Sequence, residues 1–152
     1  MQVLIFRVGN EAYGFRLSDV SEAVAGMSVS RIPRVPPPFL GIFQLRGRVI
    51  ALLDLIQCFW PSVTANAQQE TEVLVLAGAA QNLAVRVPGL VESAQIQSDE
   101  LEATAGEGIG AVLDGIVCEN QQIYHVLSAL KLLNHARNLL TESEKAVRAA
   151  GG

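Results

Sequence analysis

The sequence predicts a mostly β protein, built from two small barrels of about five strands each, with short helices and a C-terminal helix. Short runs of β-branched, aromatic and aliphatic residues alternate with turn signals roughly every 8–12 residues, as in all-β barrels. The two halves of the chain also echo each other. With 152 residues, 50% of them hydrophobic and only 17% charged, the chain can bury a core without a disulfide or a metal ion.

The strand-like runs group into hairpins. We expect strands over 3–8, 12–17, 28–32, 40–45, 48–53, 72–77, 83–87, 91–96, 112–118 and 123–127. Asp54 and Ser128 are expected to cap helices over 55–59 and from 129 to about 140, with a further short helix or a frayed tail over 141–152. The polar segment 62–71 predicts a linker, so we expect one domain over 1–140, made of subdomains over about 1–65 and 66–140.

An internal repeat supports the two-barrel prediction. A shift of 74 residues places Gly41-Ile42 on Gly115-Ile116, Arg46-Gly47 on Asn120-Gln121, Leu53 on Leu127 and Asp54 on Ser128. Each half therefore contains a hairpin, a connection, a second hairpin and a helix. Because such a unit is too small to bury its own apolar face, two copies are expected to pack together.

Composition disfavours several classes of function. The net charge of −4 and the pI of about 5.1 disfavour nucleic-acid binding and a polybasic membrane anchor. No run of about 18 apolar residues predicts a spanning helix, and the N-terminus lacks a signal-peptide pattern, so we expect a cytoplasmic protein. Cys58 and Cys118 are expected to be reduced thiols, and no metal or cofactor motif is present.

No catalytic motif is recognisable, so we do not predict an enzyme. The chain lacks a Gly-x-Ser-x-Gly elbow and a P-loop, and His125 and His135 are expected to be structural. The alternative is a small β-barrel ligand-binding protein or hydrolase, for which Glu92, Asp114 and His125 are the available polar residues. That function requires the three side chains to converge in one pocket.

The segment from Gly41 to Leu55 is the most informative. Gly47 suits a turn that requires a positive φ, and Asp54 suits a helix cap. Arg46 has no such structural need; it either holds backbone carbonyls or binds a partner.

This segment resembles the signature of CheW-like coupling domains, Gly-x-x-Asn-Leu-Arg-Gly-x-x-x-Pro-x-x-Asp-Leu, and the resemblance extends over about residues 1–134. The element 19–24 and the closing helix are also similar to that family. The structural signature residues that match are Gly41, Leu45, Arg46, Gly47, Asp54 and Leu55. The departures are Gln44 for Asn, Ala51 for Pro, Ser128 for Asp, Arg86 for Asp and Ala23 for Ile. They suggest a divergent or pilus-type member.

The resemblance implies SH3-like barrels and an adaptor that couples the cytoplasmic tip of a chemoreceptor to the regulatory domain of a CheA-type histidine kinase. Rings with other CheW-like proteins at the inner membrane are implied, without direct membrane insertion. The residues implied to bind the receptor are Arg46, Val20, Ala23, Val24, Val87 and Leu90. The residues implied to face the kinase are Phe39, Leu40 and Phe43.

Overall fold

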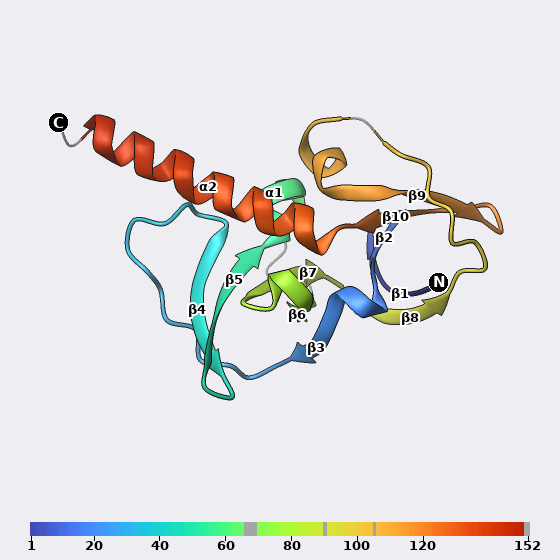
Figure 1. The fold of residues 1–152 in the computed structure, drawn as a ribbon, viewed down its shortest axis with the longest axis horizontal. Coiled ribbons are helices and arrows are strands. Elements are labelled where there is room, and N and C mark those ends of the chain that lie inside the picture. Colours follow the sequence, from blue (N-terminus) through green and yellow to red (C-terminus); the bar gives the residue numbers. More distant parts are fainter. Residues whose placement is uncertain (66–69, 90, 105, 151–152) are drawn as a thin grey trace.

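The computed structural model describes residues 1–65, 70–89, 91–104 and 106–150, and this part of the chain forms two five-stranded sheets (Figure 1). The strands are β1 (Gln2–Val8), β2 (Glu11–Arg16), β3 (Val20–Val24), β4 (Phe39–Leu45), β5 (Arg48–Asp54), β6 (Thr71–Leu76), β7 (Leu83–Pro88), β8 (Glu92–Gln95), β9 (Leu113–Glu119) and β10 (Gln122–Leu127). The α-helices are α1 (Leu55–Phe59) and α2 (Ala129–Ala150), and short 3₁₀ helices lie at Leu17–Asp19, Pro61–Ala65, Gly78–Ala80 and Gly108–Val112.

The two sheets are completed by an exchange of hairpins between the halves of the chain. One sheet has the order β8-β1-β2-β10-β9 and the other β3-β6-β7-β5-β4. The hairpin β1–β2 of the first half joins the sheet of β8, β9 and β10, and the hairpin β6–β7 of the second half joins the sheet of β3, β4 and β5. Each exchanged hairpin pairs in parallel with the last strand of the other half, β2 with β10 and β7 with β5. The predicted boundary near residue 65 therefore does not separate the two sheets. The extent of the domain, 1–140, stays a prediction.

The internal repeat is reproduced in the backbone. Gly41 and Gly115 have φ angles of 142° and 156°. A Cβ atom there would lie 2.2 Å from the carbonyl oxygen of Ser30 and 2.5 Å from that of Glu102. Next to each glycine a single antiparallel bridge joins the segment after β3 or β8 to the far edge strand, β4 or β9. These bridges curl the sheets into SH3-like subdomains, but the sheets are not closed into the predicted barrels. The predicted strand over 28–32 is wrong: in the structure this segment forms only the single bridge at Ser30.

The hairpin turns repeat as well. Arg46-Gly47 has φ angles of 48° and 81°, and Asn120-Gln121 has 51° and 64°. Each pair forms the two-residue loop between strands that remain in register on both sides. Positive φ at both central positions is typical of type I′ turns, whose twist matches that of the flanking strands.

Asp54 is fully buried and joins the two halves. Its Oδ1 accepts a hydrogen bond from the Ile56 amide at 3.0 Å, which caps α1, and its Oδ2 accepts from Gln57 Nε2 at 3.1 Å. Oδ2 also accepts from Arg86 Nη2 at 2.6 Å, across the parallel β5–β7 pair. Arg86, a departure from the family pattern, therefore neutralises the capping carboxylate. Ser128 caps α2 through the Lys131 amide at 3.1 Å.

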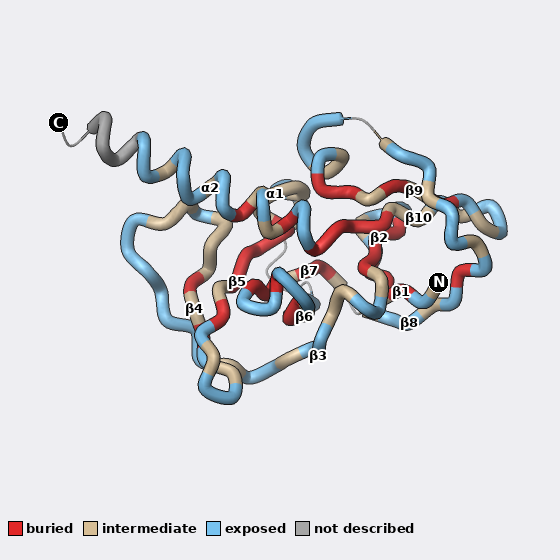
Figure 2. Tube along the Cα trace, in the orientation of Figure 1, coloured by how far each residue is buried: buried red, intermediate tan, exposed pale blue. Residues whose placement is uncertain are grey.

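The C-terminal helix is longer than predicted. The sequence predicts a helix that ends near residue 140, followed by a separate short helix or a frayed tail; α2 instead runs without interruption to Ala150. Thr141 Oγ1 donates to the Arg137 carbonyl at 2.9 Å, a bond made inside helices and not at their N-termini. The first turns of α2 bury Leu132 and Ala136 in the main core, whereas the distal part extends beyond the sheets (Figures 1 and 2).

The main core lies between the sheets and includes an aromatic group. The Trp60 ring, just after α1, lies 4.9 Å from the Tyr13 ring and 5.8 Å from the Phe6 ring, between centroids. Phe6 and Tyr13 belong to the exchanged hairpin β1–β2, so the helix of the first half packs against the sheet of the second.

We predict that Gly41→Ala destabilises the fold by about 2–4 kcal/mol, because the added methyl group would collide with backbone and the φ angle is unfavourable. The measurement is urea unfolding. Gly9→Ala is the matched control: it has a positive φ, but a Cβ there meets nothing within 4 Å, so a loss of only about 1 kcal/mol is expected. Equal losses would contradict the proposed role of the Ser30 contact.

We predict that Asp54→Ala lowers the free energy of unfolding by roughly 3 kcal/mol, because it removes a helix cap and leaves Arg86 without its carboxylate. Ser128→Ala removes the equivalent cap without an ion pair, and the expected loss is about 1 kcal/mol. Thermal or chemical unfolding of both variants measures the difference. Similar losses would show that the Asp54–Arg86 pair adds no stability.

We predict that stability falls on acidification through His135. Its ring packs on Phe59, 5.3 Å between centroids, and burial lowers the pKa of His135 below its ordinary 6.5, opposed by Glu142. The unfolded chain therefore binds the proton more readily, and stability is lost as pH falls below about 6.5. His135→Phe is expected to flatten this part of the stability profile; an unchanged slope would assign the loss to other groups.

Candidate partner-binding surfaces

Arg46 lies at the exposed tip of the β4–β5 hairpin and forms an ion pair with Glu22 of β3. Its side chain remains 69% exposed, and that of Glu22 is 29% exposed. Since β3 and β4 are opposite edges of one sheet, the pair draws the two edges together. Among the described residues, Arg46 donates a hydrogen bond to this carboxylate and to no backbone carbonyl. The structure therefore does not support the alternative in which Arg46 holds backbone carbonyls.

The predicted receptor residues divide into two groups. Val24, half-buried, lies on the same face of β3 as Glu22, the partner of Arg46, whereas the exposed Ala23 between them points to the other face. We call Glu22, Val24 and Arg46 the Arg46 surface. Glu22 was not predicted as a site residue, although it lies within the family-like element 19–24.

The remaining predicted receptor residues lie elsewhere. Val20, half-buried at the start of β3, packs against the main core. Val87 of β7 is fully buried in that core, so its side chain presents no surface to a partner. Leu90 lies outside the described residues.

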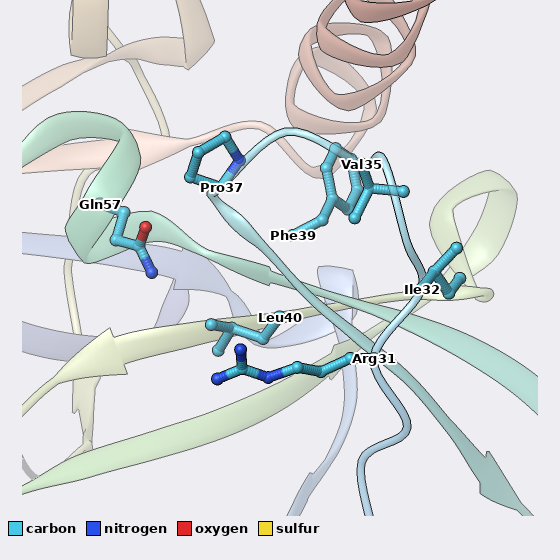
Figure 3. A pocket seen from close by; sticks show the side chains of 7 residues that line it. All are labelled: Arg31, Ile32, Val35, Pro37, Phe39, Leu40 and Gln57. Carbon is cyan, nitrogen blue, oxygen red and sulfur yellow. The ribbon is translucent and has the colours of Figure 1, made fainter.

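The predicted kinase-facing residues also divide. Phe43 is 3% exposed and packs with Ile50 and Leu52, so it is a core residue: its position on β4 points into the curl of the sheet. Phe39 and Leu40 are half-buried. They line a hollow of about 310 Å³ beside the proline-rich segment (Figure 3). We call it the proline-segment pocket; its lining residues are Arg31, Ile32, Val35, Pro37, Phe39, Leu40 and Gln57.

The other signature residues have structural roles. Gly41 admits the Ser30 carbonyl, Gly47 completes the turn and Asp54 caps α1. Leu55 is fully buried, and Leu45 packs against the cluster around Phe43. Within the signature segment, Arg46 is therefore the matching residue whose side chain the fold leaves at the surface.

The residues of the enzymatic alternative do not converge. Asp114 forms an ion pair with Arg16. His125 Nδ1 lies 2.9 Å from the Ala12 carbonyl oxygen, and its ring stacks on Tyr13 at 4.6 Å. Glu92 is exposed on the edge strand β8. Each side chain thus has separate surroundings, and they do not form one polar site.

No cluster of three or more His, Cys, Asp or Glu side chains in the described ranges is arranged to hold a metal ion. No helix in those ranges has the length and apolar character to cross a membrane.

Known proteins resemble this chain in sequence and in fold. The chemotaxis protein CheW of Klebsiella aerogenes is 34% identical over 104 residues, which are 68% of this chain and 58% of that protein. The chemotaxis protein CheW of Helicobacter pylori is 28% identical over 103 residues, or 67% of this chain and 61% of that protein. The match thus spans about six-tenths of the length of these relatives.

A solved structure shares the fold. The scaffolding protein TtCheW from Thermoanaerobacter tengcongensis superposes with a TM-score of 0.69, covering 84% of this chain and 83% of that one, at 22% identity. The CheW-like domain family matches residues 2–137. With its exchanged hairpins and its signature segment, the chain belongs to the family of CheW-like domains.

Proposed function

We propose that the chain is a non-catalytic adaptor that couples the cytoplasmic tip of a chemoreceptor to the regulatory domain of a CheA-type histidine kinase. Family membership and the names of the related proteins support a chemotaxis role. In this proposal the protein acts in the cytoplasm, is recruited to receptor arrays at the inner membrane, and contacts other CheW-like proteins in rings. It binds neither nucleic acid nor the lipid bilayer directly.

The observation that carries the proposal is the placement of Arg46. Its backbone has a φ of 48°, a conformation that suits Asn, Asp or Gly and is unfavourable for arginine. The equivalent turn of the second half has Asn120 at this position. An exposed ion pair contributes about 1 kcal/mol at most, so the fold gains little from an arginine here. A binding partner that is recognised by the two-pronged guanidinium explains an arginine at this position better than stability does.

The Arg46 surface offers such a partner two kinds of contact. The guanidinium can bind a carboxylate or a carbonyl of the receptor tip while Val24, on the same strand face as Glu22, contacts its apolar side chains. This combination suits a helical hairpin that lays an apolar face on the protein. Each pairwise contact is expected to be weak, in the micromolar range, because multivalent assembly supplies the avidity.

We predict that Arg46→Glu weakens binding of a receptor-tip fragment at least tenfold, about 1.4 kcal/mol, and leaves binding of the kinase regulatory domain unchanged. Titration calorimetry with the two partners measures both. Glu22→Arg/Arg46→Glu is the control, because it restores an ion pair at the hairpin but not the original charge pattern. Receptor binding is expected to stay weak in the double variant.

Two results would contradict the proposal. Recovery of receptor binding in the double variant would show that Arg46 acts only by holding the edges of the sheet together. Failure of the unaltered chain to bind any kinase regulatory domain or receptor fragment of its host at ~1 mM would exclude the adaptor function, since that corresponds to less than about 4 kcal/mol.

A further inference from the structure

Two adjoining hollows form an elongated apolar surface along the proline-rich segment. The proline-segment pocket lies against β4, and a second hollow of about 460 Å³ lies between the segment and the distal part of α2. The two share Val35. Ile32 and Leu140, large apolar side chains that line one hollow each, are 40% and 41% exposed. An apolar surface that continues from one hollow into another fits a chain segment better than a compact small molecule.

Uncompensated positive charge accompanies this surface. Arg31 lines the first hollow and Arg34 the second. Neither forms an ion pair within the described ranges, whereas Arg16, Arg46 and Arg86 each bind a carboxylate. The second hollow contains Glu144 beside Arg34, so the first is the one with an unbalanced charge. Arg31 and Leu40 both line the first hollow (Figure 3). A carboxylate bound there would have an apolar neighbour.

The surface is held in place before any partner binds. Four prolines between residues 33 and 38 restrict the backbone. The Pro36 carbonyl accepts a hydrogen bond from the Phe39 amide at 2.9 Å, and the Pro38 carbonyl accepts one from the Asp54 amide at 2.7 Å. These bonds fix the segment to the start of β4 and to the cap of α1. Binding to such a surface requires little further ordering of the protein.

We infer that the proline-segment pocket binds an extended segment of the kinase regulatory domain, in which a side chain of Leu or Phe size lies next to a carboxylate. The apolar side chain would contact Phe39 and Leu40, and the carboxylate would pair with Arg31. This inference rests on the proposed adaptor function and specifies the chemistry of its kinase contact. It makes Arg31, which the signature segment does not include, a specificity-determining residue.

The position of the pocket on β4 favours the kinase over the receptor. Phe39 and Leu40 begin this strand and Arg46 follows its end. At about 3.3 Å per residue, the two sites lie roughly 20 Å apart, and Figure 1 shows the β4–β5 turn at the end of the hairpin remote from α2. A receptor on the Arg46 surface would therefore leave the pocket free for a second partner.

The test compares Arg31→Glu and Ile32→Asp with the unaltered chain in titrations against the host's kinase regulatory domain and against a receptor-tip fragment. Ile32 is exposed enough for the fold to tolerate the change, and circular dichroism verifies folding. Arg7→Glu makes the same charge change on β1, where Arg7 bonds Gln122. We expect both pocket variants to weaken kinase binding at least tenfold. The Arg7 variant and all receptor titrations are expected to remain unchanged. Kinase binding by Arg31→Gln is expected to depend less on salt than that of the unaltered chain.

The outcomes separate the two proposals. Kinase binding that is equal in the pocket variants and the unaltered chain overturns the pocket inference and leaves the adaptor function standing. If the pocket variants lose receptor binding and keep kinase binding, the pocket binds the receptor, and the inference is overturned. Self-association that Arg31→Glu abolishes, measured by sedimentation, identifies a second copy as the occupant and overturns it too. Absence of any kinase or receptor binding by the unaltered chain overturns both proposals.

Discussion

Neither half of the chain can complete a sheet without a hairpin from the other half. Each sheet contains three strands of one half and a hairpin of the other, β1–β2 or β6–β7, which joins it through the parallel pair β2–β10 or β5–β7. Each sheet contains strands from both halves, so neither half of the chain can unfold while either sheet keeps its full set of strands. The Asp54–Arg86 pair lies across one of these parallel contacts and is largely withdrawn from solvent. A buried carboxylate needs such a partner, since an unpaired charge there is costly.

Because the exchange of hairpins determines the two sheets, residues outside the paired strands are free to serve binding. The fold depends little on which side chains stand there. The Arg46 turn and the proline-rich segment both lie outside the paired strands, at opposite ends of β4. Their backbones are nevertheless determined, one by the type I′ geometry and the other by prolines and two hydrogen bonds. Binding at these sites therefore orders side chains but little backbone, which lowers the entropy cost of association.

The sequence predicted nine of the ten described strands, the turns, the two helix caps and the repeat, because each depends on local residue types and spacing. It missed β3 and placed a strand over 28–32 instead. It did not predict which hairpin joins which sheet, since parallel pairing between distant segments leaves no local signal. The same limit explains Val87 and Phe43: alternation indicates which strand face is apolar but not whether that face meets the core or a partner. Glu22 and Arg31 were missed as site residues because a charge becomes informative only once its neighbours are known.

Having both surfaces on one strand has a mechanical consequence. β4 pairs along its length with β5, and the sheet behind it is packed into the core, so the distance between the Arg46 surface and the proline-segment pocket is fixed. Two partners bound at the proposed sites would then be held at a constant separation, without any conformational change in this protein. Weak contacts suffice for this role, because a rigid spacer raises the effective concentration of the second partner once the first has bound. The fixed distance between the two sites then determines which partners can bind at the same time, and high affinity at each site is not required.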